Sequence, residues 1–192
     1  MKKFILNTAF LVLNSLITRS FSQNTIRSFI MDSLDNYIVK ALHDWNVPGL
    51  AVCIVKDNQV VVVKGYGVKK VNTNDSVDQN TLFMIGSNTK SFTATALATL
   101  AYEKKLSLDD KVTKWIPDFK LEDKLAGEQA TIRDLLCHRL GFGELQGDIA
   151  NWRSNLSRKE VIANMSRIKA IYPFRTTFGY SNAGFLTAAN NT

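Results

Sequence analysis

Two apolar runs close together in the first half of the chain restrict its fold more than any other feature. Residues 49–67 have the sequence GLAVCIVKDNQVVVVKGYG, with the four polar residues 56–59 between the runs. Apolar, β-branched runs of this length around a short polar turn predict a β-hairpin. Because the runs are apolar at consecutive positions, we expect both faces of this sheet to be covered.

Helical periodicity surrounds the predicted hairpin. Apolar residues recur at three- and four-residue steps from Thr25 to Trp45 and again from Phe92 to Ala101. The first pattern predicts an amphipathic helix, and the second an apolar, largely buried one. Shorter helices are expected within residues 131–144, with Thr131 as the cap and Gly141 past the end, within 157–168, and after the loop that begins at residue 172. The chain therefore predicts an α+β fold, but a sheet of two strands alone is marginal.

The N-terminus has the pattern of an exported protein. Lys2 and Lys3 precede an apolar run over residues 4–17, and a small-residue segment ends at Ser22. This order predicts a signal peptide over residues 1–22 and a periplasmic or extracellular protein domain over 23–192. The run is too short, and too interrupted by Asn7 and Asn14, for a stable membrane span. An N-terminal membrane anchor is the alternative.

Composition excludes several other classes of protein. The net charge of +7 is spread along the 192 residues, so no nucleic-acid partner is expected. Cys53 and Cys137 both lie in apolar runs and are interpreted as small core residues. With two distant histidines and these two cysteines, neither a metal site nor a cofactor is indicated. Oligomeric state is left open.

Ser87-Asn88-Thr89-Lys90 opens the second predicted helix and admits two interpretations. Ser, Asn and Thr all favour helix N-termini, where their side-chain oxygens accept from unpaired backbone N–H groups. Alternatively, the serine is a nucleophile and the lysine its base, since residues three apart on a helix share one face. The short motif alone does not distinguish a helix start from a catalytic pair.

Three ordered motifs give the chain a family resemblance. They are Ser-Asn-Thr-Lys at residues 87–90, LLCHRLGFG at 135–143, and Tyr-Ser-Asn at 180–182. Together they resemble the serine β-lactamase-like family, which contains penicillin-binding D,D-peptidases, class C β-lactamases and related esterases. The resemblance runs from NVPGLAVCIVKD near residue 46 to YSNAGF at 185. It implies a helical region plus an antiparallel sheet flanked by helices.

The resemblance assigns a role to four residues. Ser87 is implied to be the acylated nucleophile and Lys90 its activating partner. Tyr180 is implied to carry the proton between nucleophile and leaving group, and Asn182 to bind the substrate's amide. The other interpretations are that Tyr180 is an aromatic packed beside Phe178 and that Asn182 is a helix cap.

His138 does not complete a Ser-His-acid triad in this interpretation. The sequence Gly86-Ser87-Asn88 lacks the second glycine of a nucleophile elbow. In the resembled family, a histidine at this place belongs to a His-x-x-Gly turn and is structural. His43 is expected on the surface or in packing of the N-terminal helix.

The implied function is a serine hydrolase that forms an acyl-enzyme on an amide or ester carbonyl. The substrate would be a β-lactam, a D-Ala-D-Ala peptide of peptidoglycan, or an ester. The family carries a third motif, Lys-Thr-Gly or His-x-Gly, on a later strand, whereas this sequence ends at Thr192 without one. We therefore expect the N-terminal part of a longer enzyme, with the C-terminal sheet strands missing. The alternatives are a penicillin- or peptidoglycan-binding or sensor module without turnover, and an inactive truncated fragment.

Overall fold

The structure is a computed structural model that describes residues 29–30 and 32–190. The described residues form two compact units, divided between Phe83 and Met84. The predicted signal peptide lies outside the described residues. Within the described part, no helix is long and apolar enough to cross a membrane.

The first unit contains the predicted hairpin. Strands β1 (Gly49–Lys56) and β2 (Gln59–Gly67) pair antiparallel, with Cys53 opposite Val63. Asp57 and Asn58 form the turn with φ of 50° and 61°. Asp and Asn tolerate this left-handed conformation, and a two-residue turn of this kind matches the twist of the strands. The hairpin prediction is thus confirmed.

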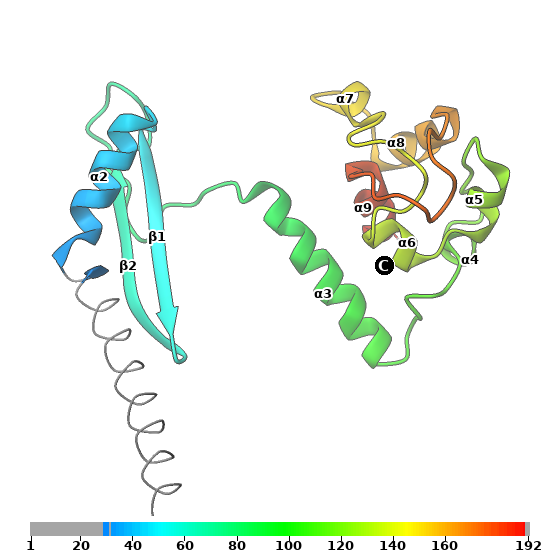
Figure 1. Ribbon diagram of the computed structural model, residues 1–192, viewed down its shortest axis with the longest axis horizontal. Coiled ribbons are helices and arrows are strands. Elements are labelled where there is room, and N and C mark those ends of the chain that lie inside the picture. Colours follow the sequence, from blue (N-terminus) through cyan, green and yellow to red (C-terminus); the bar gives the residue numbers. More distant parts are fainter. Residues whose placement is uncertain (1–28, 31, 191–192) are drawn as a thin grey trace, which may run out of the picture. The chain divides into compact units, whose positions relative to one another are not determined.

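Helix α2 (Leu34–Asp44) packs against β2 (Figure 1). The Asp35 carboxylate accepts a hydrogen bond from the Tyr66 hydroxyl at 2.7 Å and from the Lys64 ammonium at 2.6 Å. Tyr66 is buried, and burial together with the Asp35 charge raises the pKa of its phenol to about 12. This polar contact joins the helix to the strand.

The expectation that both faces of the hairpin are covered is wrong for the described residues. Burial alternates along β1: Leu50, Val52 and Ile54 are half-buried, whereas the residues between them are exposed. The physical reason within the first unit is that α2 packs against β2, while on the other face Val77 of the following loop lies only against Gly49 and Gly65.

Both cysteines were also misplaced by the sequence interpretation. Cys53 and Cys137 are exposed free thiols, not core residues. Cys53 lies among the exposed residues of β1, and Cys137 is the residue that ends helix α6 (Ile132–Leu136). An apolar run places a residue near a core without deciding which way its side chain points.

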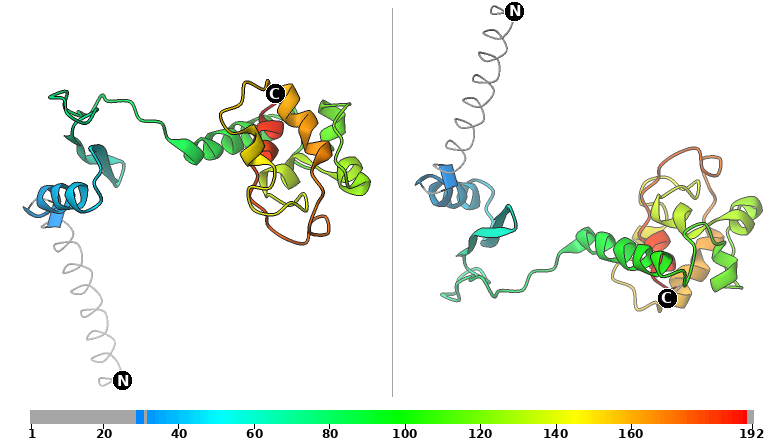
Figure 2. Two further views of the ribbon diagram at one scale, coloured as in Figure 1. Left: turned by 90° about the horizontal axis from the view of Figure 1, so that it is seen from above. Right: turned by 90° about the horizontal axis from the view of Figure 1, so that it is seen from below.

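The second unit is built around helix α9 (Asn182–Ala189). Helices α3 (Thr89–Tyr102), α6 and α8 (Arg158–Asn164) all contact α9, as Figures 1 and 2 show. The short helices α4 (Val112–Trp115), α5 (Lys124–Gln129) and α7 (Asp148–Asn151) and the 3₁₀ turns η1 (Gly86–Asn88) and η2 (Met165–Arg167) complete the unit. The most deeply buried hydrophobic residues are Leu97, Val112, Ile132, Leu135 and Met165.

Side-chain caps set where these helices begin. Thr131 caps α6 and forms a reciprocal capping box with Asp134, which confirms its predicted role. Ser157 and Glu160 form the same arrangement at α8. Gly141 follows α6 with φ of 90°, a conformation that glycine adopts without strain. Local sequence therefore specified where both helices begin, whereas α6 ends at Leu136, before the stop predicted at Gly141.

Helix α3 is less buried than its composition predicts. Leu97 is fully buried and Leu100 and Ala101 lie partly in the core, but Phe92 is 67% exposed. Within the second unit, one side of the helix contacts α9 and the core. In that unit alone α3 is therefore partly rather than largely buried, unlike the prediction.

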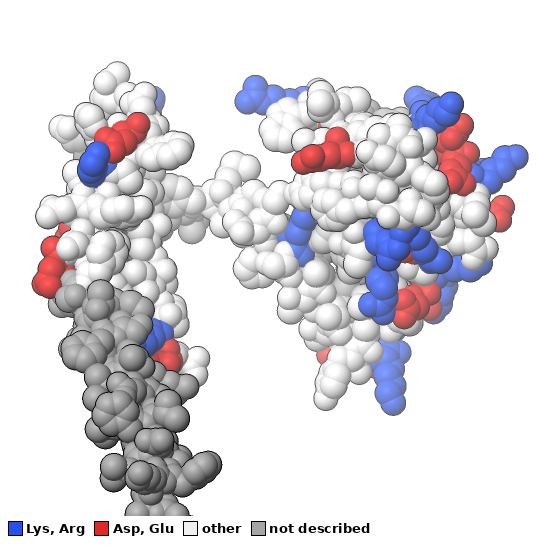
Figure 3. All heavy atoms as spheres, viewed as in Figure 1, with Lys and Arg blue, Asp and Glu red and all other residues white. Residues whose placement is uncertain are grey.

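Charged residues are mixed over the surface of the second unit. On the face shown in Figure 3, Lys and Arg side chains are interspersed with Asp and Glu. Bidentate hydrogen bonds join Arg133 to Asp109 on this unit. The surface in this view does not point to a nucleic-acid partner.

Candidate active site

Ser87 lies in the 3₁₀ turn η1, immediately before α3, and is exposed. Among the described residues, no group accepts a hydrogen bond from its backbone N–H. Lys90 lies in the first turn of α3 and is half-buried, with its ammonium nitrogen 3.5 Å from the Ser87 hydroxyl oxygen. The three-residue spacing thus places the two side chains side by side, as predicted.

Tyr180 reaches the same place from the loop before α9. Its phenol oxygen lies 2.5 Å from the Ser87 hydroxyl oxygen. The Lys90 ammonium lies 4.6 Å from the centroid of the Tyr180 ring. Lys90 and then the Ser87 hydroxyl hold the pKa of the Tyr180 phenol below its ordinary value. The phenol is therefore easier to ionise here than in water.

Asn182 is the first residue of α9 and points its side-chain oxygen at Lys90. That oxygen accepts from the Lys90 ammonium at 2.6 Å. Ser181, and not Asn182, is the helix cap, since its hydroxyl oxygen accepts from the Gly184 N–H. The helix-cap interpretation of Asn182 is wrong, and all four predicted site residues lie within one hydrogen-bonded cluster.

The alternative interpretation of Tyr180 is an aromatic packed beside Phe178, and both rings contact His138. Phe178 is 65% exposed and contacts His138 edge-on at 5.2 Å between ring centroids. Tyr180 instead stacks on His138, with centroids 4.7 Å apart and an interplanar angle of 27°. Its ring is thus supported by histidine while its hydroxyl faces Ser87.

His138 is buried behind the cluster and makes no hydrogen bond to Ser87 within the described residues. Its Nδ1 accepts from the Ser181 N–H at 3.0 Å. Burial, and then the nearby Lys90 charge, lower the pKa of the imidazole, while Asp148 opposes them. His43, by contrast, is exposed at the end of α2 beside Asp44, as expected.

Asp148 is a buried member of the cluster that the sequence analysis missed. Its two carboxylate oxygens accept from the backbone N–H groups of Asn182 at 2.7 Å and Ala183 at 3.1 Å. A carboxylate at a helix N-terminus is favoured because it binds unpaired N–H groups and faces the positive end of the helix dipole. Asp148 is 34 positions before Asn182. No local pattern could have indicated the contact.

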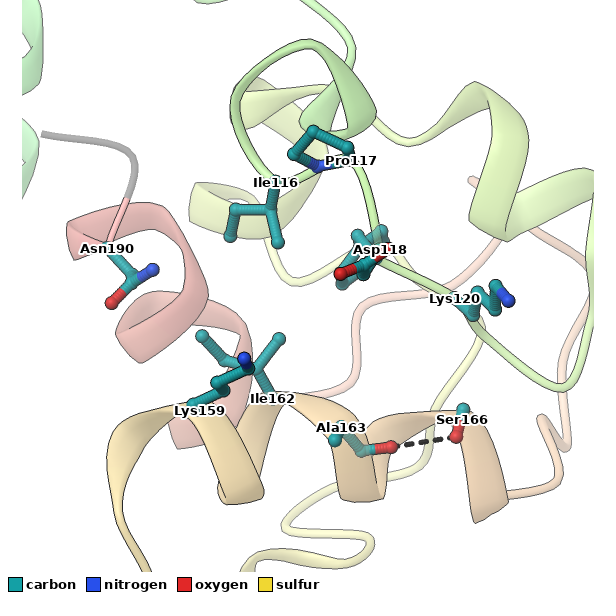
Figure 4. A pocket seen from close by; sticks show the side chains of 10 residues that line it. Ile116, Pro117, Asp118, Lys120, Lys159, Ile162, Ala163, Ser166 and Asn190 are labelled. Carbon is teal, nitrogen blue, oxygen red and sulfur yellow. Dashed lines mark hydrogen bonds between the residues drawn. The ribbon is translucent and has the colours of Figure 1, made fainter.

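Among the pockets of the second unit, one lies apart from this cluster and another reaches it at Lys90. One of about 520 Å³ lies between the loop after α4 and helix α8 (Figure 4). It includes Lys120 and Lys159, and Ser166 there donates to a backbone oxygen. A smaller hollow of about 250 Å³ includes Lys90 and Arg158. Within residues 29–30 and 32–190, no cluster of three metal-binding side chains occurs.

Comparison with known proteins shows the family of the chain. A profile of the Beta-lactamase family matches residues 34–190. The protein flp of Staphylococcus aureus (strain COL) is 34% identical over 122 residues, which cover 64% of this chain and 24% of flp. The chain thus spans about a quarter of the length of this relative.

Solved structures show the same similarity. The octameric penicillin-binding protein homologue from Pyrococcus abyssi superposes with a TM-score of 0.71 at 31% identity, covering 84% of this chain and 38% of that one. The D-alanine carboxypeptidase AmpC from Burkholderia cenocepacia gives 0.66 at 26%, covering 85% and 44%. The expected α+β class, with the fold of serine β-lactamases and penicillin-binding proteins, is confirmed, and the chain belongs to the Beta-lactamase family.

Proposed function

We propose that this chain carries the acylation residues of a serine hydrolase that acts on an amide or ester carbonyl. The observation that carries the proposal is the 2.5 Å contact between the Ser87 and Tyr180 oxygens, next to Lys90. Membership of the Beta-lactamase family supports a hydrolase of this superfamily. Beyond family membership, we propose the identity of the nucleophile, the mechanism and the substrate class.

In the proposed reaction, Tyr180 is the immediate proton acceptor. Its oxygen is closer to the Ser87 hydroxyl than the Lys90 nitrogen is, at 2.5 Å against 3.5 Å. The Ser87 oxygen attacks the carbonyl carbon while its proton passes to the Tyr180 phenolate. Tyr180 then gives this proton to the departing amine or alcohol, which leaves an acyl-serine and restores the phenolate. Lys90 supports the cycle by lowering the pKa of that phenol.

In the proposed reaction, two groups bind the substrate. The Ser87 N–H has no acceptor among the described residues and lies at the start of a helix, where an oxyanion is stabilised. The Lys90 ammonium donates a hydrogen bond to the side-chain oxygen of Asn182. The side-chain amide nitrogen of Asn182 can therefore donate a hydrogen bond to the substrate. Asn182 is in this way oriented by the lysine.

The proposed substrates follow from the relatives. The similar structures include a penicillin-binding homologue and a D-alanine carboxypeptidase. We propose a β-lactam, a peptide ending in D-Ala-D-Ala, or an ester, with no cofactor.

We also propose that the protein is exported to the periplasm or the outside of the cell. The charged, apolar and small-residue order of residues 1–22 supports this localisation.

Covalent labelling tests the proposal. The protein, in the full length that its gene encodes, is treated with a labelled penicillin and with an activated ester, and intact mass locates the adduct. Ser87→Ala should abolish labelling because no other residue of the cluster can form the acyl bond. Ser91→Ala is the matched control, since the Ser91 hydroxyl donates only to the Asn88 carbonyl one turn away. Unchanged labelling of Ser87→Ala would refute the assignment.

The same experiment separates a hydrolase from a binding or sensor module. A hydrolase releases the acyl group and turns over the ester. A module without turnover would keep the adduct on Ser87 after excess label is removed. An ester-derived adduct that persists for hours, with no turnover of the ester, would show that the protein is such a module and not a hydrolase.

A further inference from the structure

Two buried residues hold the backbone of the loop that carries Tyr180 and Asn182. The His138 carbonyl oxygen accepts from the Gly179 N–H at 2.9 Å, and its ring Nδ1 accepts from the Ser181 N–H at 3.0 Å. The two Asp148 oxygens accept from the N–H groups of residues 182 and 183. Four backbone N–H groups of one short segment therefore donate their hydrogen bonds to only two residues.

Both residues are only 7% exposed, so water does not replace these acceptors. At the start of α9, Asp148 binds the first two N–H groups and the Ser181 hydroxyl binds the third, on Gly184. The first N–H groups of a helix have no partner within the helix. Here a residue from a distant segment supplies two of the partners, and this fixes the point at which Asn182 enters the helix.

We propose that His138 and Asp148 are positioning residues, which hold the Tyr180 oxygen on Ser87 and the Asn182 side chain on Lys90. This inference rests on the proposed function of these four residues. His138 acts through its ring and its backbone, since the ring both stacks on Tyr180 and accepts from Ser181. Asp148 acts through the first turn of α9.

The rate of the proposed proton transfer depends on how precisely these side chains are positioned. Proton transfer requires hydrogen-bond distance between the reacting oxygens, and a displacement of about 1 Å can cost ~10²-fold in rate. The Nδ1 contact also requires a neutral imidazole with its proton on Nε2, because a protonated Nδ1 cannot accept. The charged and titratable groups facing the ring are Lys90, Tyr180 and Asp148.

The test compares two pairs of variants in the full-length protein. Asp148→Ala removes both acceptors, whereas Asp148→Asn keeps one side-chain oxygen. His138→Phe keeps an aromatic ring without an acceptor, whereas His138→Asn keeps an acceptor near Nδ1 and tolerates the φ of 57° at this position. Asp118→Ala is the control, because Asp118 is exposed and has no ion pair or side-chain hydrogen bond among the described residues.

Two measurements are made on each folded variant. The first is the rate of acylation by a chromogenic ester, with kcat and KM separated. The second is the titration of the Tyr180 phenol by ¹³C NMR of labelled tyrosine, assigned with Tyr180→Phe. A residue that only stabilises the fold would leave both unchanged once the protein is folded. The titration needs no substrate, so it tests positioning even if the proposed function fails.

We expect Asp148→Ala and His138→Phe to lose ~10²-fold in kcat with little change in KM. Their Tyr180 titration should move up toward the ordinary value of about 10, because the phenol leaves Lys90 and Ser87. The asparagine variants should recover most of both losses. Folded Asp148→Ala and His138→Phe with the acylation rate and Tyr180 titration of the Asp118→Ala control would overturn the proposal. If Asp148→Ala does not fold, the His138 pair decides by the same criteria.

Discussion

The hydroxyl oxygen of Ser87 lies 2.5 Å from the phenol oxygen of Tyr180, although the two residues are 93 positions apart in the sequence. The contact exists because α3 and α9 pack against each other and each of the two residues lies just before the N-terminal end of its helix. Lys90, one turn along α3, lies beside both oxygens. The arrangement makes specific predictions about each residue, all for the full-length protein unless stated.

Tyr180→Phe tests the proton carrier. The substitution keeps the ring that stacks on His138 and removes only the hydroxyl, so folding should be preserved. The acylation rate should fall by ~10²–10⁴, the usual size of a general acid–base contribution. Stopped-flow acylation with a chromogenic ester, together with a melting curve, provides the measurement. A variant that melts early but reacts normally per folded molecule would reassign Tyr180 to packing.

Lys90→Met tests the electrostatic role of the lysine. The methionine keeps the volume of the stem, while the positive charge beside Tyr180 is lost. The pKa of the Tyr180 phenol should rise, because Lys90 is the largest cause of its lowering. Acylation at neutral pH should slow by ~10²–10⁴. A loss below tenfold, or an unchanged phenol titration, would argue against this role.

Gly179→Ala tests the close approach behind Tyr180. A Cβ atom at this position would lie 1.8 Å from the Phe142 carbonyl oxygen, so the backbone of one segment must move. We expect a loss of about 1–3 kcal/mol in the free energy of unfolding, the range for overpacking. Gly184→Ala in α9 is the control, because its Cβ would meet the Leu135 oxygen at an ordinary 3.5 Å. Chemical denaturation of both variants measures the difference, and equal stability would contradict the argument.

His138 predicts a pH dependence of stability. Burial and then Lys90 hold the pKa of its imidazole below the ordinary value of about 6.5, so the folded state resists protonation. The stabilisation is complete above pH ~6.5 and is lost as the pH falls from there toward the folded pKa, by up to about 1.4 kcal/mol per pH unit. His138→Asn should lack this loss. Urea unfolding between pH 7.5 and 5.5 measures the free energy of unfolding of both proteins. If this free energy changed with pH equally in the two proteins, the prediction would be contradicted.

The exposed apolar surface predicts self-association of residues 23–192 expressed alone. Val60 and Val63 of β2 are 63% and 46% exposed, and Phe92 of α3 is 67% exposed. Uncovered strand edges and apolar faces pair with other chains. Sedimentation velocity should show oligomers or aggregates, and Val63→Lys should reduce the association. A soluble monomer without such association would contradict this prediction.

Sequence patterns gave much of the local structure correctly. The polar turn at Asp57-Asn58 and the apolar runs beside it predicted the hairpin, and Thr131 predicted the start of α6. These features depend on side chains within a few residues of one another, so a linear pattern contains them. The short helices α4, α5 and α7 were not predicted, because four to six residues do not establish a helical period.

Burial was predicted less well for a physical reason. Cys53, Phe92 and the outer face of β1 are apolar by sequence, yet they are exposed in the described structure. Hydrophobicity indicates that a residue would gain from burial, but the position of a partner element decides whether it is buried. That information is not local to any of these segments.

The sequence by itself determined which residues were candidates for the chemistry and placed Ser87 and Lys90 on one face of a helix start. Only the tertiary structure brought Tyr180 and Asn182 to them, through the packing of α9 on α3. It alone revealed Asp148, a buried carboxylate that binds the first N–H groups of a helix 34 positions later. Helical spacing is fixed by bonds within one turn, whereas such a contact depends on how the whole core packs.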